Sequence, residues 1–410
     1  MLAITRRRTR RAVLSIAAVA AAAALAAPVM AQSDKPIRIG IPASIQNQLG
    51  KDIRDGAQLA IDELNAKGGV LGRKLEAVVA DESNTNDAAI AAIKKLTADE
   101  KVDVMVGGWS SGFALAQLPH ISAAKTPYLI CGAAAPAITA GVTKDYENYK
   151  YIFRTTLNSV DLARDTVDYA VNFIGKEKGI KKIAIVAESA AWTRALVPFL
   201  EKAIKDAGID VSAVEYFEIK TTDFSPMFAK IRDSGAGYML QVVSHATSDI
   251  FVKQWADAKV PVPLGGLDAK AQEADFFTRV DGKALGQTTI VPVLRAAVTP
   301  KTIPFWDAFV KKYDRTPVYT ASTAYDSVHI YAEAVKRAGT TETNAVVKAL
   351  EQTDYVSTSG RVVFTTTHDL RYGTGYVRWL QVQWQKDGKR AIVWPKDKAD
   401  GELVSPPWMK

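Results

Sequence analysis

The sequence predicts an α/β fold with two doubly wound parallel-sheet lobes. Short, continuously apolar strand patterns alternate with amphipathic helix patterns, which is typical of parallel sheets covered on both faces. This alternation occurs in two separate series, so we expect two sheets. The 410-residue chain is also long enough for two ordinary domains, each with its own core.

The chain begins with a predicted signal peptide, residues 1–31. Five arginines within residues 6–11 are followed by an Ala-rich apolar run at 12–27 and by small residues before Ala31. The arginines leave export through the general or the twin-arginine route open. The only cysteine, Cys131, is far from the cleavage point and cannot carry a lipid there. We therefore expect a soluble periplasmic protein without an internal disulfide.

The charge of the chain comes largely from this leader. The sequence has 52 basic and 44 acidic residues, and five of the basic ones lie in the leader, which leaves 47 against 44. No run of Lys and Arg with interleaved aromatic residues remains, so nucleic-acid binding is not expected. No paired Cys and His ligands are present either, and the sequence predicts no metal and no other cofactor.

The first series of elements runs from residue 37 to about residue 130. A helix pattern that includes Gln58 is followed by Gly68 and Gly69, whose positive-φ conformations end a helix. A strand pattern that ends at Ala80 comes next. The expected strands are residues 37–41, 75–80, 102–106 and 127–130, and further helices are expected at 87–98 and 113–124.

The second series follows a β-rich segment at 151–156 that lacks helical periodicity, as a chain crossing between lobes should. The expected strands are 182–186, 211–217, 238–243 and 262–265, and the expected helices are 161–174, 193–207 and 225–233.

The stretch QLAIDELNAKGGVLGRKLE at 58–76 closely resembles the first helix and turn of amino-acid-type periplasmic solute-binding proteins. The best-known members of that family bind leucine, isoleucine and valine for ABC importers. Further landmarks come in the family's order: residues 151–156, Asp223-Phe224-Ser225, a helix at 321–337, and 360–364 before a final strand pair. The resemblance covers residue 37 to about residue 384.

The resemblance implies a type I periplasmic-binding-protein fold, a Venus flytrap whose chain crosses between the lobes three times. Lobe 1 is then expected to comprise residues 36–156 plus 292–372. Lobe 2 is expected to comprise 157–291 plus 373–394, and residues 395–410 form a C-terminal tail. Ligand is expected between the lobes, and the hinged closure of the two lobes traps it.

The lobe 1 part of the site is expected at strand ends. Ser110 and Ser111 follow the third strand and open a helix, where backbone N–H groups and hydroxyls can bind an anionic group; they could also simply cap that helix. The resemblance places Ser110 at the ligand carboxylate, and Gly132 and Ala134 in a second ligand loop. Ala134 departs from the Thr or Ser usual in branched-chain amino-acid binders, and it therefore lacks the hydroxyl that helps hold an amino acid.

The lobe 2 part of the site is expected to include Asp268, as partner of a ligand ammonium or as a helix cap, and Trp192, as a pocket wall or a core residue. Ser244 and His245 end another strand. The resemblance adds two positions of lobe 1, Tyr325 on the hinge side and Leu49 near the mouth.

The predicted function is solute capture for import. A small carboxylate enters the cleft, and the closed form docks on a membrane permease; the protein is expected to be a monomer without catalysis. The missing Thr hydroxyl favours an aromatic or aliphatic acid or an amide, whereas Asp268 favours an amino acid, and both remain open. A ligand-sensing partner role is a second reading.

The third reading is a serine hydrolase. Gly108-Trp109-Ser110-Ser111-Gly112 fits G-x-S-x-G between a strand and a helix, and Asp268 with His329 or His368 would complete a triad. No oxyanion loop precedes Ser110, and a hydrolase needs no second βαβ series, so solute binding is the preferred prediction.

Overall fold

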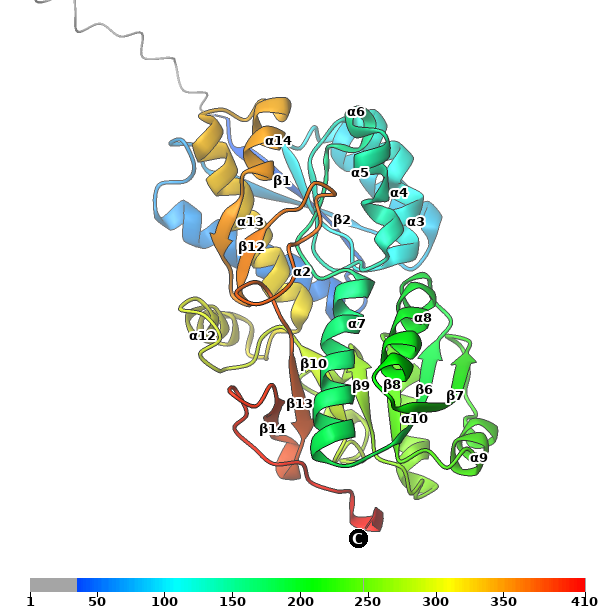
Figure 1. Ribbon diagram of the computed structural model, residues 1–410. Helices are drawn as coiled ribbons and strands as arrows, with labels where there is room; N and C mark the ends of the chain where they lie inside the picture. Colours follow the sequence, from blue (N-terminus) through cyan, green and yellow to red (C-terminus); the bar gives the residue numbers. More distant parts are fainter. Residues whose placement is uncertain (1–34, 246, 410) are drawn as a thin grey trace, which may run out of the picture.

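A computed structural model describes residues 35–245 and 247–409. The predicted signal peptide lies outside these described residues. The chain forms two α/β lobes, one above the other in Figure 1, which confirms the predicted fold class. Among the described helices, none combines the length and apolar character that a membrane crossing requires.

The lobe 1 sheet has five parallel strands in the order β2-β1-β3-β4-β5. β1 lies next to both β2 and β3, so the chain reverses its winding direction there, and an open α/β sheet binds its ligand beyond the strand ends at such a point. The first four strands confirm the predicted ones, and the fifth comes from the crossing segment. Their bounds are β1 Ile37–Ala43, β2 Leu75–Asp81, β3 Val104–Gly107, β4 Tyr128–Ile130 and β5 Ile152–Arg154.

The lobe 1 helices cover both faces of this sheet (Figure 1). The long helix α2 ends as predicted, because Gly68 and Gly69 adopt φ values of 94° and 83°. A Cβ on Gly69 would also lie 1.9 Å from the carbonyl oxygen of Arg73, so only glycine fits the turn. The helices are α2 Gln48–Ala66, α3 Asn86–Lys94 with a π-helical turn Lys95–Asp99, α4 Ser111–Ala124, α5 Ala140–Lys144, α6 Tyr146–Tyr149, α13 Tyr319–Ala338 and α14 Thr343–Glu351.

The lobe 2 sheet repeats this arrangement with four parallel strands in the order β7-β6-β8-β9. The strand expected at 262–265 instead spans Leu264–Asp268, which moves its end three residues along the chain. The other strands are β6 Lys182–Glu188, β7 Asp210–Phe217 and β8 Tyr238–Val243; the helices are α7 Ser159–Asp168 with a π-helical continuation Tyr169–Glu177, α8 Ala191–Asp206, α9 Ser225–Asp233, α10 Thr247–Asp257 and α11 Phe276–Arg279.

Later parts of the chain return to both lobes. The strands β10 Thr288–Val291, β13 Leu380–Trp384 and β14 Arg390–Trp394 form an antiparallel sheet beside β9, and β11 Asp354–Val356 pairs with β12 Arg361–Val363. Helix α12 Thr302–Tyr313 lies at one side of the molecule in Figure 1. The residue boundaries proposed for each lobe stay a prediction.

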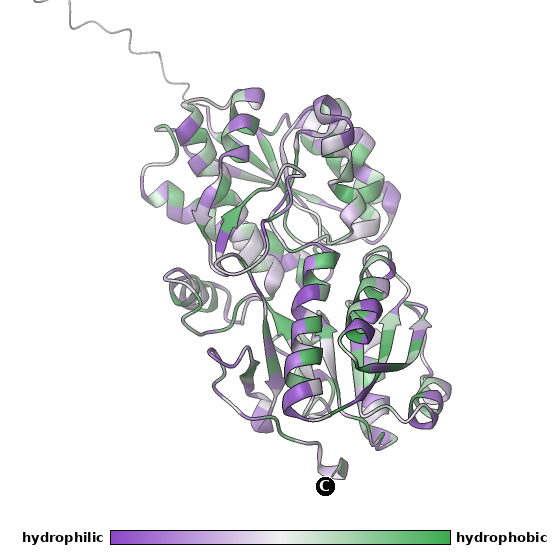
Figure 2. Cartoon of the chain, viewed as in Figure 1, coloured by the Kyte–Doolittle hydropathy of each residue, from purple (hydrophilic) through white to green (hydrophobic). Residues whose placement is uncertain are grey.

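The core of each lobe is its sheet. All residues of β3, β4, β6 from Ile183 onward, β8 and β9 are buried. Figure 2 shows hydrophobic colours on the central strands and hydrophilic colours on the outer sides of the helices. Near the C-terminus, Trp408 packs edge-on against Trp255 at 5.0 Å between ring centroids, so the tail is bound to lobe 2.

Candidate functional site

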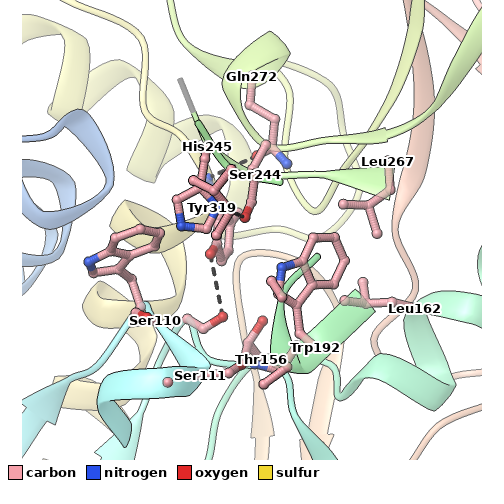
Figure 3. Close-up of a pocket in the computed structure, with 18 of the residues that line it drawn as sticks. Ser110, Ser111, Thr156, Leu162, Trp192, Ser244, His245, Leu267, Gln272 and Tyr319 are labelled. Carbon is pink, nitrogen blue, oxygen red and sulfur yellow. Dashed lines mark hydrogen bonds between the residues drawn. The ribbon is translucent and has the colours of Figure 1, made fainter. Parts of the chain in front are cut away.

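A cavity of about 200 Å³ lies where the carboxyl ends of the two sheets face each other. A cavity of about 150 Å³ is enough to admit benzene, so this one has room for a small solute. Residues of both lobes line it (Figure 3): Trp109, Ser110, Ser111, Gly112, Gly132, Ala134, Thr156, Leu162, Ala190, Ala191, Trp192, Ile219, Ser244, His245, Leu267, Ala269, Gln272, Tyr319 and Trp379.

The lobe 1 wall is built around the N-terminus of α4. Ser110 occupies the N-cap position in an extended conformation, yet its side chain makes no capping hydrogen bond. Within the described chain, no protein group is hydrogen-bonded to its hydroxyl. The first backbone N–H groups of α4 have no partner within the helix and carry the positive end of its dipole. This wall therefore offers several hydrogen-bond donors to an anion.

Ser111 differs from Ser110 in its hydrogen bonds. Its hydroxyl oxygen accepts hydrogen bonds from the backbone N–H groups of Ala134 and Ala135, at 3.2 and 3.1 Å. The hydroxyl proton stays available for a second partner, because both of these contacts use the oxygen as acceptor. Ser111 thus joins the two ligand loops that the sequence predicted, and its proton can still reach the cavity.

The loop after β4 is held from behind by a buried cation. Arg154, fully buried, donates to the carbonyl oxygens of Ala133 and Ala135 at 2.9 and 3.0 Å and forms an ion pair with Asp369 at 2.7 Å. In the same loop, a Cβ on Gly132 would lie 2.7 Å from the Cα of Trp109. Close packing and these hydrogen bonds fix the loop before any ligand arrives.

Two further lobe 1 residues face the cavity. Thr156 lines it, and among the described residues its hydroxyl has no hydrogen-bond partner. Tyr319, at the start of α13, directs its hydroxyl toward the carbonyl oxygen of Gly132 at 3.4 Å, and its ring lies 5.5 Å from that of Trp379. Figure 3 shows Ser110, Ser111 and Thr156 on one side of the cavity, opposite Ser244 and His245.

The lobe 2 wall is organised by Glu188, the last residue of β6, which is fully buried. Its carboxylate accepts five hydrogen bonds of 2.5 to 3.1 Å from three residues, namely the backbone N–H and hydroxyl of Ser244, the backbone N–H and Nδ1 of His245, and Nε1 of Trp192. Burial alone would raise the pKa of Glu188, but the hydrogen bonds from His245 and Ser244 outweigh it and hold the pKa below its usual value.

Apart from Gln272, the rest of the lobe 2 wall is apolar. Leu162, Trp192, Ile219, Leu267 and Trp379 surround the body of the cavity. No Asp, Glu, Lys or Arg lines the cavity, so His245 and Tyr319 are its only titratable side chains. The cavity thus combines a polar lobe 1 wall with an apolar enclosure.

The structure brings seven of the ten predicted site residues together around the cavity: Ser110, Ser111, Gly132, Ala134, Trp192, Ser244 and His245. The predicted cavity roles of the other three need correction.

Asp268 lies beneath the cavity wall. Because β9 extends to Asp268, strand alternation directs Leu267 into the cavity and the Asp268 side chain to the other face. This fully buried carboxylate accepts from Gln241 and Gln287 at 2.7 and 2.8 Å and from Ser248 at 2.5 Å. Burial raises the pKa of Asp268 to about 6. Its other oxygen accepts from the backbone N–H groups of Lys270 and Ala271 at 2.9 and 3.2 Å, so Asp268 caps the 3-10 turn Lys270–Gln272. The predicted capping role is confirmed, and Asp268 is not placed to pair with a ligand ammonium.

Tyr325 and Leu49 are core residues of lobe 1. The Tyr325 hydroxyl donates to Glu63 at 2.7 Å and its ring packs on Phe305, on the face of α13 away from the cavity. Leu49 is 2% exposed in the first turn of α2, where its carbonyl oxygen accepts from Thr320. The neighbouring Tyr319, six residues before Tyr325, lines the cavity instead.

Sequence reasoning missed several cavity residues: Trp109, Thr156, Leu162, Ile219, Gln272, Tyr319 and Trp379. Trp109 and Thr156 belong to segments that the analysis did single out, so strand-end position was a usable signal for them. Trp379 lies just before β13, in a part of the chain without the βα alternation, and no local pattern marks it.

The predicted hydrolase triad is not assembled. His329 lies 3.6 Å from Glu63, and the His368 ring is buried against Phe153, 4.0 Å between centroids. Neither histidine lines the cavity that contains Ser110. The G-x-S-x-G match therefore lies in a loop at a strand end that lines the cavity.

The chain was compared with known proteins. The model of the family described as "Periplasmic binding protein" matches residues 36–389. A Leu/Ile/Val-binding protein homolog 7 from Brucella suis is 27% identical over 368 residues, which cover 87% of this chain and 90% of that protein.

Solved structures share the fold. The branched-chain amino acid substrate-binding protein LivJ of Streptococcus pneumoniae, in complex with isoleucine, has a TM-score of 0.77 at 23% identity and covers 88% of this chain and 100% of its own. A solute-binding protein from Rhodopseudomonas palustris, in complex with 3,4-dihydroxybenzoic acid, has a TM-score of 0.76 at 22% identity and covers 92% and 99%. These likenesses show a type I periplasmic-binding-protein fold.

Proposed function

Because the chain belongs to the periplasmic binding protein family, we propose that it is the solute-binding component of an ABC importer. It captures a small carboxylate between its lobes and delivers it to a membrane permease. The two-lobed fold and the cavity between the lobes support this role. The observation that carries the proposal is the unpartnered Ser110 hydroxyl at the N-terminus of α4.

The carboxylate of the ligand is assigned to lobe 1. Ser110, the proton of Ser111 and the first N–H groups of α4 can all donate to it, and the helix dipole favours a negative charge there. Thr156 adds a further hydroxyl at the same wall. The rigid loop around Gly132 keeps these donors in place, so little ordering is needed on binding.

The body of the ligand is assigned to the apolar enclosure formed by Trp192, Leu162 and Leu267. A buried ammonium group needs a carboxylate or several acceptors, and the cavity wall carries no carboxylate. Asp268 and Glu188 both use their oxygens for internal hydrogen bonds. The cargo is therefore an apolar carboxylate without an ammonium group, in preference to a branched-chain amino acid.

The cargo is held by residues of both lobes. The Trp109 ring of lobe 1 lies 5.6 Å from the His245 ring of lobe 2, so the cavity is closed between them. A ligand that contacts both walls stabilises this closed form over an open one, which is how binding shifts the population. We propose that the protein acts without catalysis, in the periplasm and as a monomer, and that the closed form docks on the permease. Presentation of the ligand to a separate sensor protein would use the same closed form.

A thermal-shift screen of ligand-stripped protein tests the class of cargo. The screen compares leucine, 4-methylpentanoate, pentanoate and benzoate at concentrations up to saturation. Ligand at about 100 times its Kd adds about 2.7 kcal/mol to the free energy of unfolding. We expect the acids without an amino group to stabilise the protein. Stabilisation by leucine alone would overturn the assignment of the cargo.

Ser110→Ala tests the lobe 1 assignment. Loss of one hydrogen bond to a charged group should weaken every carboxylate ligand by about 1.5–3 kcal/mol, measured by calorimetry, with little change in the unfolding of the ligand-free protein. Ser225→Ala is the matched control, because Ser225 also opens a helix, α9, but lies exposed and outside the cavity. Equal affinities of both variants would remove Ser110 from the site.

A further inference from the structure

The Glu188–His245 pair carries an inference that rests on the proposed function and deepens it. We propose that His245 presents a hydrogen-bond acceptor, its Nε2 lone pair, to the ligand. The cargo is then a carboxylate that carries a neutral hydrogen-bond donor, such as a hydroxyl, at the end away from the carboxylate.

The five donors around Glu188 fix which nitrogen of His245 carries the proton. Two of them are backbone N–H groups and a third is the indole N–H of Trp192, none of which can accept a hydrogen bond. A carboxylate so surrounded is ionised and can only accept. Nδ1 of His245 lies 2.9 Å from Oε1 of Glu188 and 3.2 Å from the Ser244 hydroxyl oxygen, whose own proton goes to Glu188, so Nδ1 carries a hydrogen. In a neutral imidazole with its hydrogen on Nδ1, Nε2 keeps its lone pair.

The Nε2 atom belongs to a side chain that lines the cavity. Among the described residues, no protein group is hydrogen-bonded to it, and the His245 side chain lines the cavity with 27% of its surface exposed. The other two polar side chains of this wall have protein partners. Ser244 donates its hydroxyl to Glu188 at 2.5 Å. Gln272 donates its amide to the carbonyl oxygen of Ile290 at 3.0 Å and accepts from the backbone N–H of Tyr319 at 3.2 Å. Nε2 is thus the polar atom that the lobe 2 wall offers to a ligand.

The position of His245 determines where the ligand needs its donor. Figure 3 shows the His245 ring and Ser244 on the side of the cavity opposite Ser110, Ser111 and Thr156. A solute whose carboxylate lies at α4 reaches His245 with its far end. A hydroxyl there donates to Nε2, whereas a second carboxylate would place an acceptor against an acceptor.

Matched acids with and without a terminal hydroxyl test the proposal: 4-hydroxybenzoate with benzoate, and 5-hydroxypentanoate with pentanoate, measured by calorimetry. For whichever pair binds, we expect the hydroxylated acid to bind up to about tenfold more tightly at pH 8, the effect of one hydrogen bond.

Two variants separate recognition from a structural role. His245→Phe keeps the ring shape without an acceptor and should abolish the hydroxyl preference while benzoate or pentanoate still binds. His245→Gln replaces the ring by an amide oxygen of similar reach and should retain part of the preference. Thermal unfolding of both ligand-free variants verifies that they are folded.

Each outcome separates the inference from the proposed function. If no carboxylate binds at all, the proposed function fails. If the plain and hydroxylated acids bind equally, or if His245→Phe keeps the preference, only this inference is overturned.

Discussion

Two buried glutamates at strand ends, one in each lobe, differ in the number of hydrogen bonds that they accept. Glu82 directly follows β2 in lobe 1 and Glu188 ends β6 in lobe 2, and both are fully buried. Glu82 accepts one side-chain hydrogen bond, from Gln117 at 2.6 Å, and its Oε2 has no partner among the described residues. Glu188 accepts five hydrogen bonds.

The physical consequence is a difference in charge. Burial raises the pKa of Glu82 to about 7, with the Gln117 hydrogen bond opposing the shift. The donors around Glu188 reverse the effect of burial and lower its pKa. Glu82 is thus partly protonated near pH 7, where it accepts from Gln117 of α4, whose amide also donates to the carbonyl oxygen of Ala89. Glu188 is an anion that shapes the cavity wall. The number of donors, not burial, decides which role a strand-end glutamate takes.

The largest change in unfolding free energy is expected for Glu188→Gln. Its amide replaces one acceptor oxygen by a donor group, which leaves donors of Ser244 and His245 without a partner. We expect a loss of about 3–6 kcal/mol of unfolding free energy at pH 7, because two donors each lose a hydrogen bond to a charged group, worth about 1.5–3 kcal/mol. Because the folded pKa of Glu188 lies below its unfolded value, its contribution is present above about pH 4.5 and is lost as the pH falls through the folded pKa.

Denaturant unfolding at several pH values between 3 and 7 measures this loss. The difference between the two proteins should shrink toward acid pH. A difference that stays constant over the range would mean that the charge of Glu188 is not what stabilises the wall.

Glu82→Gln should act in the opposite direction. The folded pKa of about 7 lies above the unfolded value near 4.5, so the stability that Glu82 contributes is complete below pH 4.5 and lost as the pH rises through 7. A neutral amide of the same shape avoids this loss, so the variant should gain up to about 3 kcal/mol over wild type at pH 9 and nothing at pH 4. A variant that is less stable than wild type at pH 9 would contradict the raised pKa.

Ser244→Ala is expected to change the unfolding free energy least of these three variants. Its effects on stability and on ligand affinity can be compared directly with those of Ser110→Ala. The Ser244 hydroxyl bonds to Glu188 at 2.5 Å, whereas the Ser110 hydroxyl is unpartnered. Ser244→Ala should therefore lower the unfolding free energy by about 1.5–3 kcal/mol and change ligand affinity less. Ser110→Ala should do the reverse. Thermal unfolding measures the stability of both variants, and calorimetry measures their ligand affinity. If both variants show the same changes in stability and affinity, Ser244 does not stabilise the fold while Ser110 binds the ligand.

Much of the fold could be predicted from the sequence, because the period of apolar residues reports local structure directly. The glycine stop after α2 and the crossing at 151–156 are local features of this kind. Strand β10 pairs with β13, whose residues lie about ninety positions further along the chain, and no local pattern records such a contact.

Site residues that directly follow a strand could be predicted from the sequence. Residues whose role depends on the direction of the side chain could not. Ser110, Gly132 and His245 were found from their position after a strand. Asp268 was misplaced because a strand end displaced by three residues changes which side chains face the cleft. The role of Glu188 depends on a partner segment about 56 residues away, so its donors could not be read from its neighbours in the chain.

The single thiol has a practical consequence for turning the protein into an optical reporter. Cys131 is fully buried, and burial raises its pKa far above the usual range, so the nucleophilic thiolate does not form under ordinary labelling conditions. A cysteine introduced at an exposed rim position would be the one thiol that reacts with a maleimide dye. One substitution and labelling with a dye would then convert the protein into a fluorescent sensor for its solute.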